Sequence, residues 1–151
     1  MKETLCVYIA FLKALQTWFH AAHHVAHGCS QAGDHALLYG VIYVSLGETL
    51  DGAIEKSIAL TDCVDIADPY TILHSALEVL DGWKSPHLCG SDELAMFALE
   101  YEMTYLDVVE AIFASVERSG KLTLGLNDFL SASANEHEGF VYKLKQRSKP
   151  N

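Results

Sequence analysis

The segment Leu5–Phe19, LCVYIAFLKALQTWF, contains the pattern on which the fold prediction depends. Its apolar residues recur every three or four positions, which is the spacing of side chains along one face of an α-helix. These residues are Leu5, Ile9, Leu12, Leu15 and Phe19. Gly28 is a natural helix stop, so we predict a first helix over about residues 3–27.

Four further segments show helical periodicity, and two of them have a recognisable beginning. Asp34 follows a glycine and is predicted as the N-cap of the second long helix. Pro69 suits the first turn of a short helix. The five predicted helices span about residues 3–27, 34–60, 69–82, 91–119 and 126–147. This order predicts a single all-α domain over residues 1–151, a four-helix bundle with a short helix in a long crossover.

The charge of the chain limits its partners. Ten basic and twenty acidic residues give a net charge of −10. Four of the basic residues lie in a predicted C-terminal tail over residues 143–151, namely Lys143, Lys145, Arg147 and Lys149. Residues 1–142 therefore carry −14, which repels nucleic acid and attracts cations. Any contact with DNA would have to come from the basic tail.

The sequence gives no indication of export or of a membrane partner. No uninterrupted apolar run reaches the roughly 18 residues that a membrane span needs. Charged residues and helical spacing at the N-terminal end argue against a signal peptide. The four cysteines, Cys6, Cys29, Cys63 and Cys89, include no CxxC pair. These features predict a cytoplasmic protein with free thiols.

Three carboxylates interrupt an apolar face of the second predicted helix. Glu48, Asp51 and Glu55 lie between Val44 and Ile58 at steps of three and four residues, so all five share one face. Burying an ionised carboxylate costs several kcal/mol unless a positive group compensates it. A metal ion or a hydrated subunit interface is the simplest compensation, and the alternative is a solvated acidic face.

Histidines at the end of the first predicted helix supply complementary metal ligands. His20, His23, His24 and His27 fall within one arc of roughly 100°. Among these, His23 continues the apolar stripe, where a hydrogen-bonded core histidine is the alternative interpretation. Imidazole together with carboxylate suits iron, and also zinc or manganese.

Helix geometry separates His35 from Asp51. Asp51 lies sixteen positions after His35, which is about 24 Å along a helix, so the two side chains cannot bind one ion within one straight helix. If both bind one ion, they come from two chains at a two-fold interface or the helix breaks. A di-iron site inside one bundle needs Glu-x-x-His on two helices, and no histidine here has Glu three positions before it, so a site within one chain is disfavoured. The acidic residues of the third long helix mostly avoid its apolar stripe and are predicted to be solvated; they are Glu100, Glu102, Asp107, Glu110 and Glu117. On the last helix, His137 falls on the apolar face and is predicted to lie in the core.

At these residues the chain resembles the Dps family, the mini-ferritins or DNA-binding proteins from starved cells. The segment His20–Gly28 is similar to the His-x-x-His-Trp-x-x-x-Gly motif of that family, and His35 follows His23 by twelve residues as its second ligand histidine does. Asp51 and Glu55 look like its Asp-x-x-x-Glu pair.

The sequence departs from the family pattern at several positions. His24 stands where the family usually has tryptophan, and Tyr39 where an aspartate often helps to bind metal. The interval from His35 to Asp51 is one residue longer than usual, so Glu48 is kept as a further candidate ligand. The lysine-rich N-terminal arm of DNA-binding members is absent.

The resemblance implies a ferritin-like bundle that assembles into a twelve-subunit shell and stores iron. It implies a ferroxidase that oxidises Fe(II), preferably with hydrogen peroxide, and so limits oxidative damage. His23 and His35 of one chain, with Asp51, Glu55 and the further candidate Glu48 of its two-fold partner, would bind the iron. The alternatives are a DNA-binding shell that uses the basic tail, with weak or no ferroxidase activity, and a helical interaction protein without metal.

Overall fold

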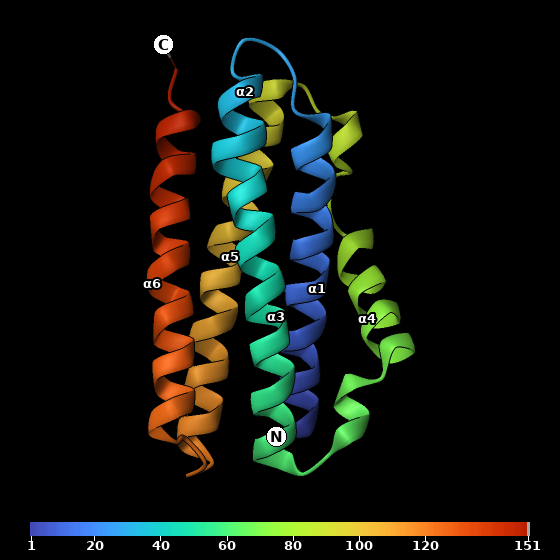
Figure 1. Cartoon of the computed structure of the whole chain (residues 1–151), viewed down its shortest axis with the longest axis vertical. Helices are drawn as coiled ribbons and strands as arrows, with labels where there is room; N and C mark the ends of the chain where they lie inside the picture. Colours follow the sequence, from blue (N-terminus) through green and yellow to red (C-terminus); the bar gives the residue numbers. More distant parts are fainter. Residues whose placement is uncertain (151) are drawn as a thin grey trace.

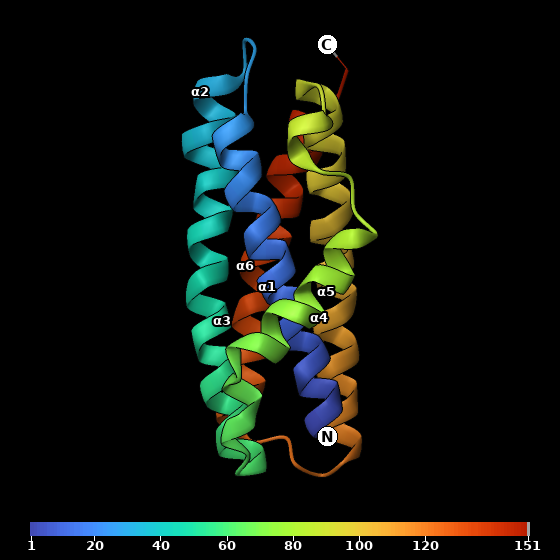
Figure 2. The same cartoon turned by 90° about the vertical axis from the view of Figure 1, so that its right-hand side faces the viewer.

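The computed structural model describes residues 1–150, and all regular structure in that range is helical. Four long helices make up most of the chain, and they lie lengthwise beside one another (Figure 1). These are α1 (Lys2–Val25), α3 (Gly40–Thr61), α5 (Ser91–Arg118) and α6 (Leu124–Arg147). The shorter α4 (Pro69–Asp81) packs obliquely across the outside of α1, as Figure 2 shows. The prediction of an all-α chain with five principal helices is confirmed.

Short helical segments connect the long helices. They are α2 (Gln31–Gly33), the π-helical η1 (Asp34–Tyr39) and the 3₁₀ segments η2 (Val64–Ala67) and η3 (Pro86–Leu88). α2, η1 and α3 follow one another without a break, so the second long helix begins at Gln31, earlier than predicted. α3 and α5 run in the same direction because α4 lies in the crossover between them (Figure 1).

An arginine fastens the end of α6 to the beginnings of two other helical segments. Arg147 Nε donates to both carboxylate oxygens of Asp34, at 3.0 and 3.1 Å, and Nη1 donates to Asp92 at 3.0 Å. The Asp34 side chain is only 7% exposed. The prediction of Asp34 as an N-cap is therefore wrong, because its carboxylate binds Arg147 instead. Residues 143–147 of the predicted basic tail belong to α6, which continues to Arg147.

The apolar stripe of α1 forms the centre of the protein. Leu12, Leu15 and Phe19 are completely buried, and α1 contacts α3, α4 and α5. Length and composition alone would let α1 and the continuous segment Gln31–Thr61 cross a membrane. Core helices pass the same test, and 61% and 50% of their most apolar windows are buried inside the protein.

A buried acid–imidazole pair joins α5 to α6. Glu102 and His137 are both fully buried, and His137 Nδ1 lies 2.6 Å from Glu102 Oε2. The prediction of His137 as a core residue is confirmed, but the prediction of Glu102 as solvated is wrong. Burial raises the pKa of the Glu102 carboxyl, and the hydrogen bond to His137 partly opposes that rise. Glu102 Oε1 and His137 Nε2 have no hydrogen-bond partner.

We predict that removing one member of this pair destabilises the protein more than replacing both. Glu102→Ala or His137→Ala leaves an uncompensated buried group and should lower the free energy of unfolding by about 3–5 kcal/mol. The double variant Glu102→Met, His137→Phe fills the same space with apolar groups and should cost much less. Urea denaturation of the three variants provides the comparison, and a double variant at least as unstable as both single variants would contradict it.

Candidate metal centre

Two of the predicted ligand histidines form a reciprocal pair between α1 and η1. His23 Nδ1 lies 2.7 Å from the backbone oxygen of His35, and His35 Nδ1 lies 2.6 Å from the backbone oxygen of His23. Their rings stack with centroids 3.8 Å apart and planes inclined by 17°. His23 O belongs to the last turn of α1, where a helix carbonyl lacks an intrahelical donor. The pair therefore satisfies a helix end and closes the α1–α3 hairpin.

These hydrogen bonds fix the protonation pattern of both imidazoles. A carbonyl oxygen only accepts, so each Nδ1 must carry the proton that it donates. In the neutral ring Nε2 is then the atom with the free lone pair. Metal-binding histidines commonly donate their other ring N–H to a backbone carbonyl in this way, which fixes the ring and its tautomer. His23 and His35 thus both have the tautomer of an Nε2 metal ligand.

A glycine in the second helix makes room for the pair. The N–H of Gly40 donates to His35 O, the five-residue step of a π-helix. A Cβ built on Gly40 would lie 2.7 Å from His35 O and 2.8 Å from His23 Nδ1. Any other residue at position 40 would therefore push against the histidine pair. Tyr39, the residue before Gly40, is fully buried in the core.

The π-helical segment also changes the register of the carboxylates that follow. A five-residue hydrogen-bond step accommodates one residue more than the four-residue step of an α-helix. Side chains after η1 therefore point in the directions that they would have in a regular α-helix with one residue fewer after His35.

The candidate carboxylates lie on the exposed side of α3. Glu48, Asp51 and Glu55 are all exposed, so the isolated chain presents them to solvent. They continue, at steps of three and four, a line of exposed apolar residues, Leu37, Val41 and Val44, which are 72%, 41% and 58% exposed. We call these six residues the outer stripe. Its upper half is apolar and its lower half is acidic.

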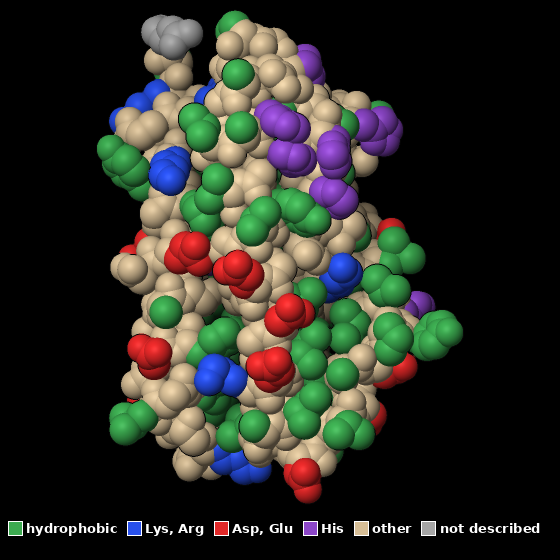
Figure 3. All heavy atoms as spheres, viewed as in Figure 1, with side chains coloured by type: hydrophobic (Ala, Val, Ile, Leu, Met, Phe, Trp, Pro, Cys, Tyr) green, Lys and Arg blue, Asp and Glu red, His purple; other side chains and the backbone are tan. Residues whose placement is uncertain are grey.

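The histidines and the carboxylates occupy different parts of one face. Figure 3 shows histidine side chains gathered towards one end of the α1–α3 face and acidic side chains further along it. Within residues 1–150, no group of three or more His, Cys, Asp or Glu side chains is placed to hold a metal ion. The chain by itself brings His23 and His35 together but not with Asp51, Glu55 or Glu48.

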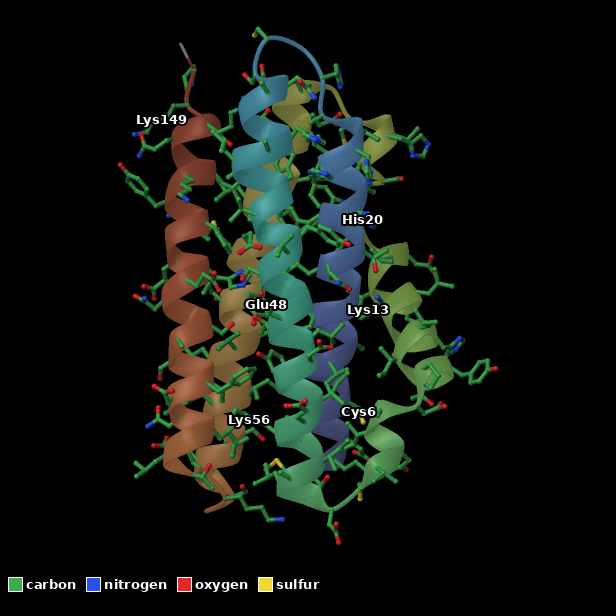
Figure 4. The ribbon with its side chains drawn as sticks, viewed as in Figure 1. Cys6, Lys13, His20, Glu48, Lys56 and Lys149 are labelled. Atoms are coloured by element: carbon green, nitrogen blue, oxygen red, sulfur yellow. The ribbon has the colours of Figure 1, made fainter. Side chains whose placement is uncertain are left out.

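A lysine that the sequence pattern did not associate with the carboxylates lies in the same groove. Lys13 and Gln16 from α1 line an open groove of about 450 Å³ together with Glu48 and Asp51 from α3. Figure 4 shows Lys13 and Glu48 at a similar height on neighbouring helices. Lys13 Nζ donates to Gln16 Oε1 at 3.0 Å. Helix pairing explains why this cation was missed, because it lies on a different helix from the acids.

The other histidines of the arc remain at the surface. His20, His24 and His27 are exposed, and His24 Nε2 lies 3.2 Å from His20 Nε2. Partial desolvation, followed by repulsion from His20, His23 and His35, lowers the pKa of His24.

The basic residues near the C-terminus are less available than the sequence suggested. Arg147 is bound to Asp34 and Asp92, and its side chain is 17% exposed. The three lysines, Lys143, Lys145 and Lys149, are exposed. Of the four charges predicted for DNA contact, one is therefore already neutralised by carboxylates.

Comparison with protein-family models, with curated proteins and with solved structures finds no match for this chain.

We predict that Gly40→Ala disturbs the histidine pair. The added methyl group must displace His23 or the η1 backbone, which should lower the free energy of unfolding by about 1–3 kcal/mol. Nitrogen NMR should then detect a mixture of His23 tautomers instead of the single form that is protonated at Nδ1.

Gly33→Ala is the matched control, because nothing lies within 4 Å of a Cβ built there. It should leave stability unchanged or raise it slightly, since alanine favours a helix over glycine. Equal behaviour of the two variants would contradict the role assigned to Gly40.

Proposed function

We propose that the protein is a ferritin-like four-helix bundle of the Dps type that oxidises and stores iron at sites shared between two chains. Iron is the substrate and the stored product. The observation that carries the proposal is the His23–His35 pair, in which both Nδ1 atoms hold backbone carbonyls and both Nε2 atoms are left for a ligand. Four long helices, with α4 in the crossover, support the bundle.

A two-fold axis would complete the site. In an isologous interface, residue i of one chain meets residue j of the other, and j meets i. Val44 lies about midway along the outer stripe between His35 and Asp51, and it is 58% exposed. An axis through this region would place the histidine end of each chain on the acidic end of its partner. It would also bury Val44 and Val41 against their copies.

The proposed ligands suit the chemistry. His23 and His35 would supply neutral nitrogen donors, while Asp51 and Glu55 of the partner would supply hard anionic oxygens that favour the ferric product. Glu48, one turn before Asp51, would attract Fe(II) towards the site. Hydrogen peroxide accepts one electron from each of two Fe(II) ions together with two protons from solvent, and it leaves as two water molecules without releasing hydroxyl radical.

A dodecameric shell in the cytoplasm is the arrangement that the family resemblance implies, and the four cysteines are free thiols as a reduced compartment requires. The DNA-binding alternative is less well supported, because Arg147 is engaged by Asp34 and Asp92. If the chain is instead a helical interaction protein without metal, it should neither oxidise iron nor form a large assembly.

We predict that single substitutions at either half of the site slow iron oxidation. His23→Ala and Asp51→Ala should each lower the initial rate of ferric absorbance after Fe(II) and peroxide are mixed, by about tenfold or more. His87→Ala and Asp107→Ala remove exposed residues of the same types elsewhere and should oxidise iron at the wild-type rate. Wild-type rates in both site variants would refute the proposed function.

We predict that assembly depends on the middle of the outer stripe. Val44→Glu would place two carboxylates against each other across the axis, so light scattering should detect a smaller species. Val64→Glu is the control, because Val64 is 76% exposed on η2 and lies outside the stripe. An unchanged assembly size in Val44→Glu, or a monomeric wild type, would contradict the two-fold interface.

A further inference from the structure

Two exposed histidines on successive turns of α1 face each other with their outer nitrogens. His20 and His24 are four residues apart, which places them one above the other on the helix surface. Their Nε2 atoms are 3.2 Å apart, and their ring centroids are 4.9 Å apart. Both side chains are exposed, and Figure 4 labels His20 on the upper half of α1.

The spacing of these nitrogens is that of two ligands on one metal ion. Imidazole nitrogens lie about 2.0–2.1 Å from a tetrahedral Zn²⁺, which separates two of them by roughly 3.3 Å. The observed 3.2 Å needs almost no adjustment. A hydrogen bond between the same atoms is possible only when one Nε2 carries a proton and the other does not.

Neighbouring rings hold the pair in this orientation. The His20 ring stacks on Tyr43 from α3, with centroids 4.3 Å apart and planes inclined by 10°. The His24 ring lies edge-on to His23, with centroids 4.9 Å apart. Since both imidazoles are already restrained, binding an ion would lose less side-chain freedom than binding to free surface histidines.

We propose that His20 and His24 form a bis-imidazole site for a divalent transition-metal ion such as Zn²⁺, Ni²⁺ or Cu²⁺. Water completes the coordination sphere, because no third His, Cys, Asp or Glu within residues 1–150 converges on the pair. Affinity follows the order Cu²⁺ above Zn²⁺ and Ni²⁺, and these above Mn²⁺. Mg²⁺ and Ca²⁺, which prefer oxygen ligands, do not compete.

This site is independent of the proposed iron chemistry. Both of its ligands come from one helix of one chain, so it needs no partner subunit. The ferroxidase proposal uses the Nε2 atoms of His23 and His35 with carboxylates from a second chain. Redox-inactive Zn²⁺ binds without any oxidation step, and variants of His20 and His24 distinguish its binding at this site from binding at His23 and His35.

The test is calorimetric titration of the chelator-treated full chain with Zn²⁺, in a background of Asp51→Ala and Glu55→Ala. That background removes Asp51 and Glu55, two of the three exposed carboxylates proposed for the shared site. We expect one Zn²⁺ per chain, and X-ray absorption at the zinc edge should detect two imidazole nitrogens. Adding His20→Gln or His24→Gln should weaken binding by about tenfold or more.

His27→Gln is the matched control, because His27 is exposed on the same segment but its Nδ1 lies 3.0 Å from Val25 O rather than in the pair. It should bind Zn²⁺ as the background does. Unchanged binding in His24→Gln, no binding in the background, or four imidazoles around the ion would each overturn the proposal. Zinc binding without iron oxidation in the wild type would support this site and refute the proposed function. Iron oxidation without zinc binding at His20 and His24 would support the proposed function and refute this site.

Discussion

The reciprocal hydrogen bonds between His23 and His35 are the constraint on which the rest of the proposed site depends. They join the last turn of α1 to η1 and close the loop between the first two long helices. They also decide which ring nitrogens are protonated, so the Nδ1 atoms have a structural role and the Nε2 atoms would have the proposed ligand role. The π-helical step at Gly40 is part of this arrangement, because a side chain at that position would occupy the space of the His23 ring.

The face that carries this pair changes in residue type along its length, and this change favours a site shared between two chains. Imidazoles lie at one end, the carboxylates Glu48, Asp51 and Glu55 lie further along α3, and exposed valines lie between them. Within one chain, His35 and Asp51 are separated by sixteen positions, about 24 Å along the helix. Two-fold symmetry is the simplest operation that brings them together twice, and it buries the apolar middle at the same time.

Periodicity predicted the five principal helices because burial of one helix face is a local pattern. The approach of His23 to His35 was expected only through the family resemblance, and their hydrogen bonds were not foreseen. Glu102 was placed in solvent although Ala98, Glu102 and Tyr105 continue one buried face, and a polar residue in that register was the missed signal. The contact of Arg147 with Asp34 joins residues 113 positions apart, which no local pattern encodes. The π-helical segment was missed because a period of 3.6 residues cannot represent one inserted residue.

The most direct test of a shared site is complementation between two inactive variants. Chains with His23→Ala and chains with Asp51→Ala are unfolded together, mixed in equal amounts, refolded and assayed for iron oxidation. In a mixed pair, one of the two sites at the interface has both His23 from one chain and Asp51 from the other. Random pairing makes about half of the pairs mixed, so about a quarter of wild-type activity should be restored. Mixtures no more active than the separate variants, although the chains are shown to have exchanged, would contradict the account.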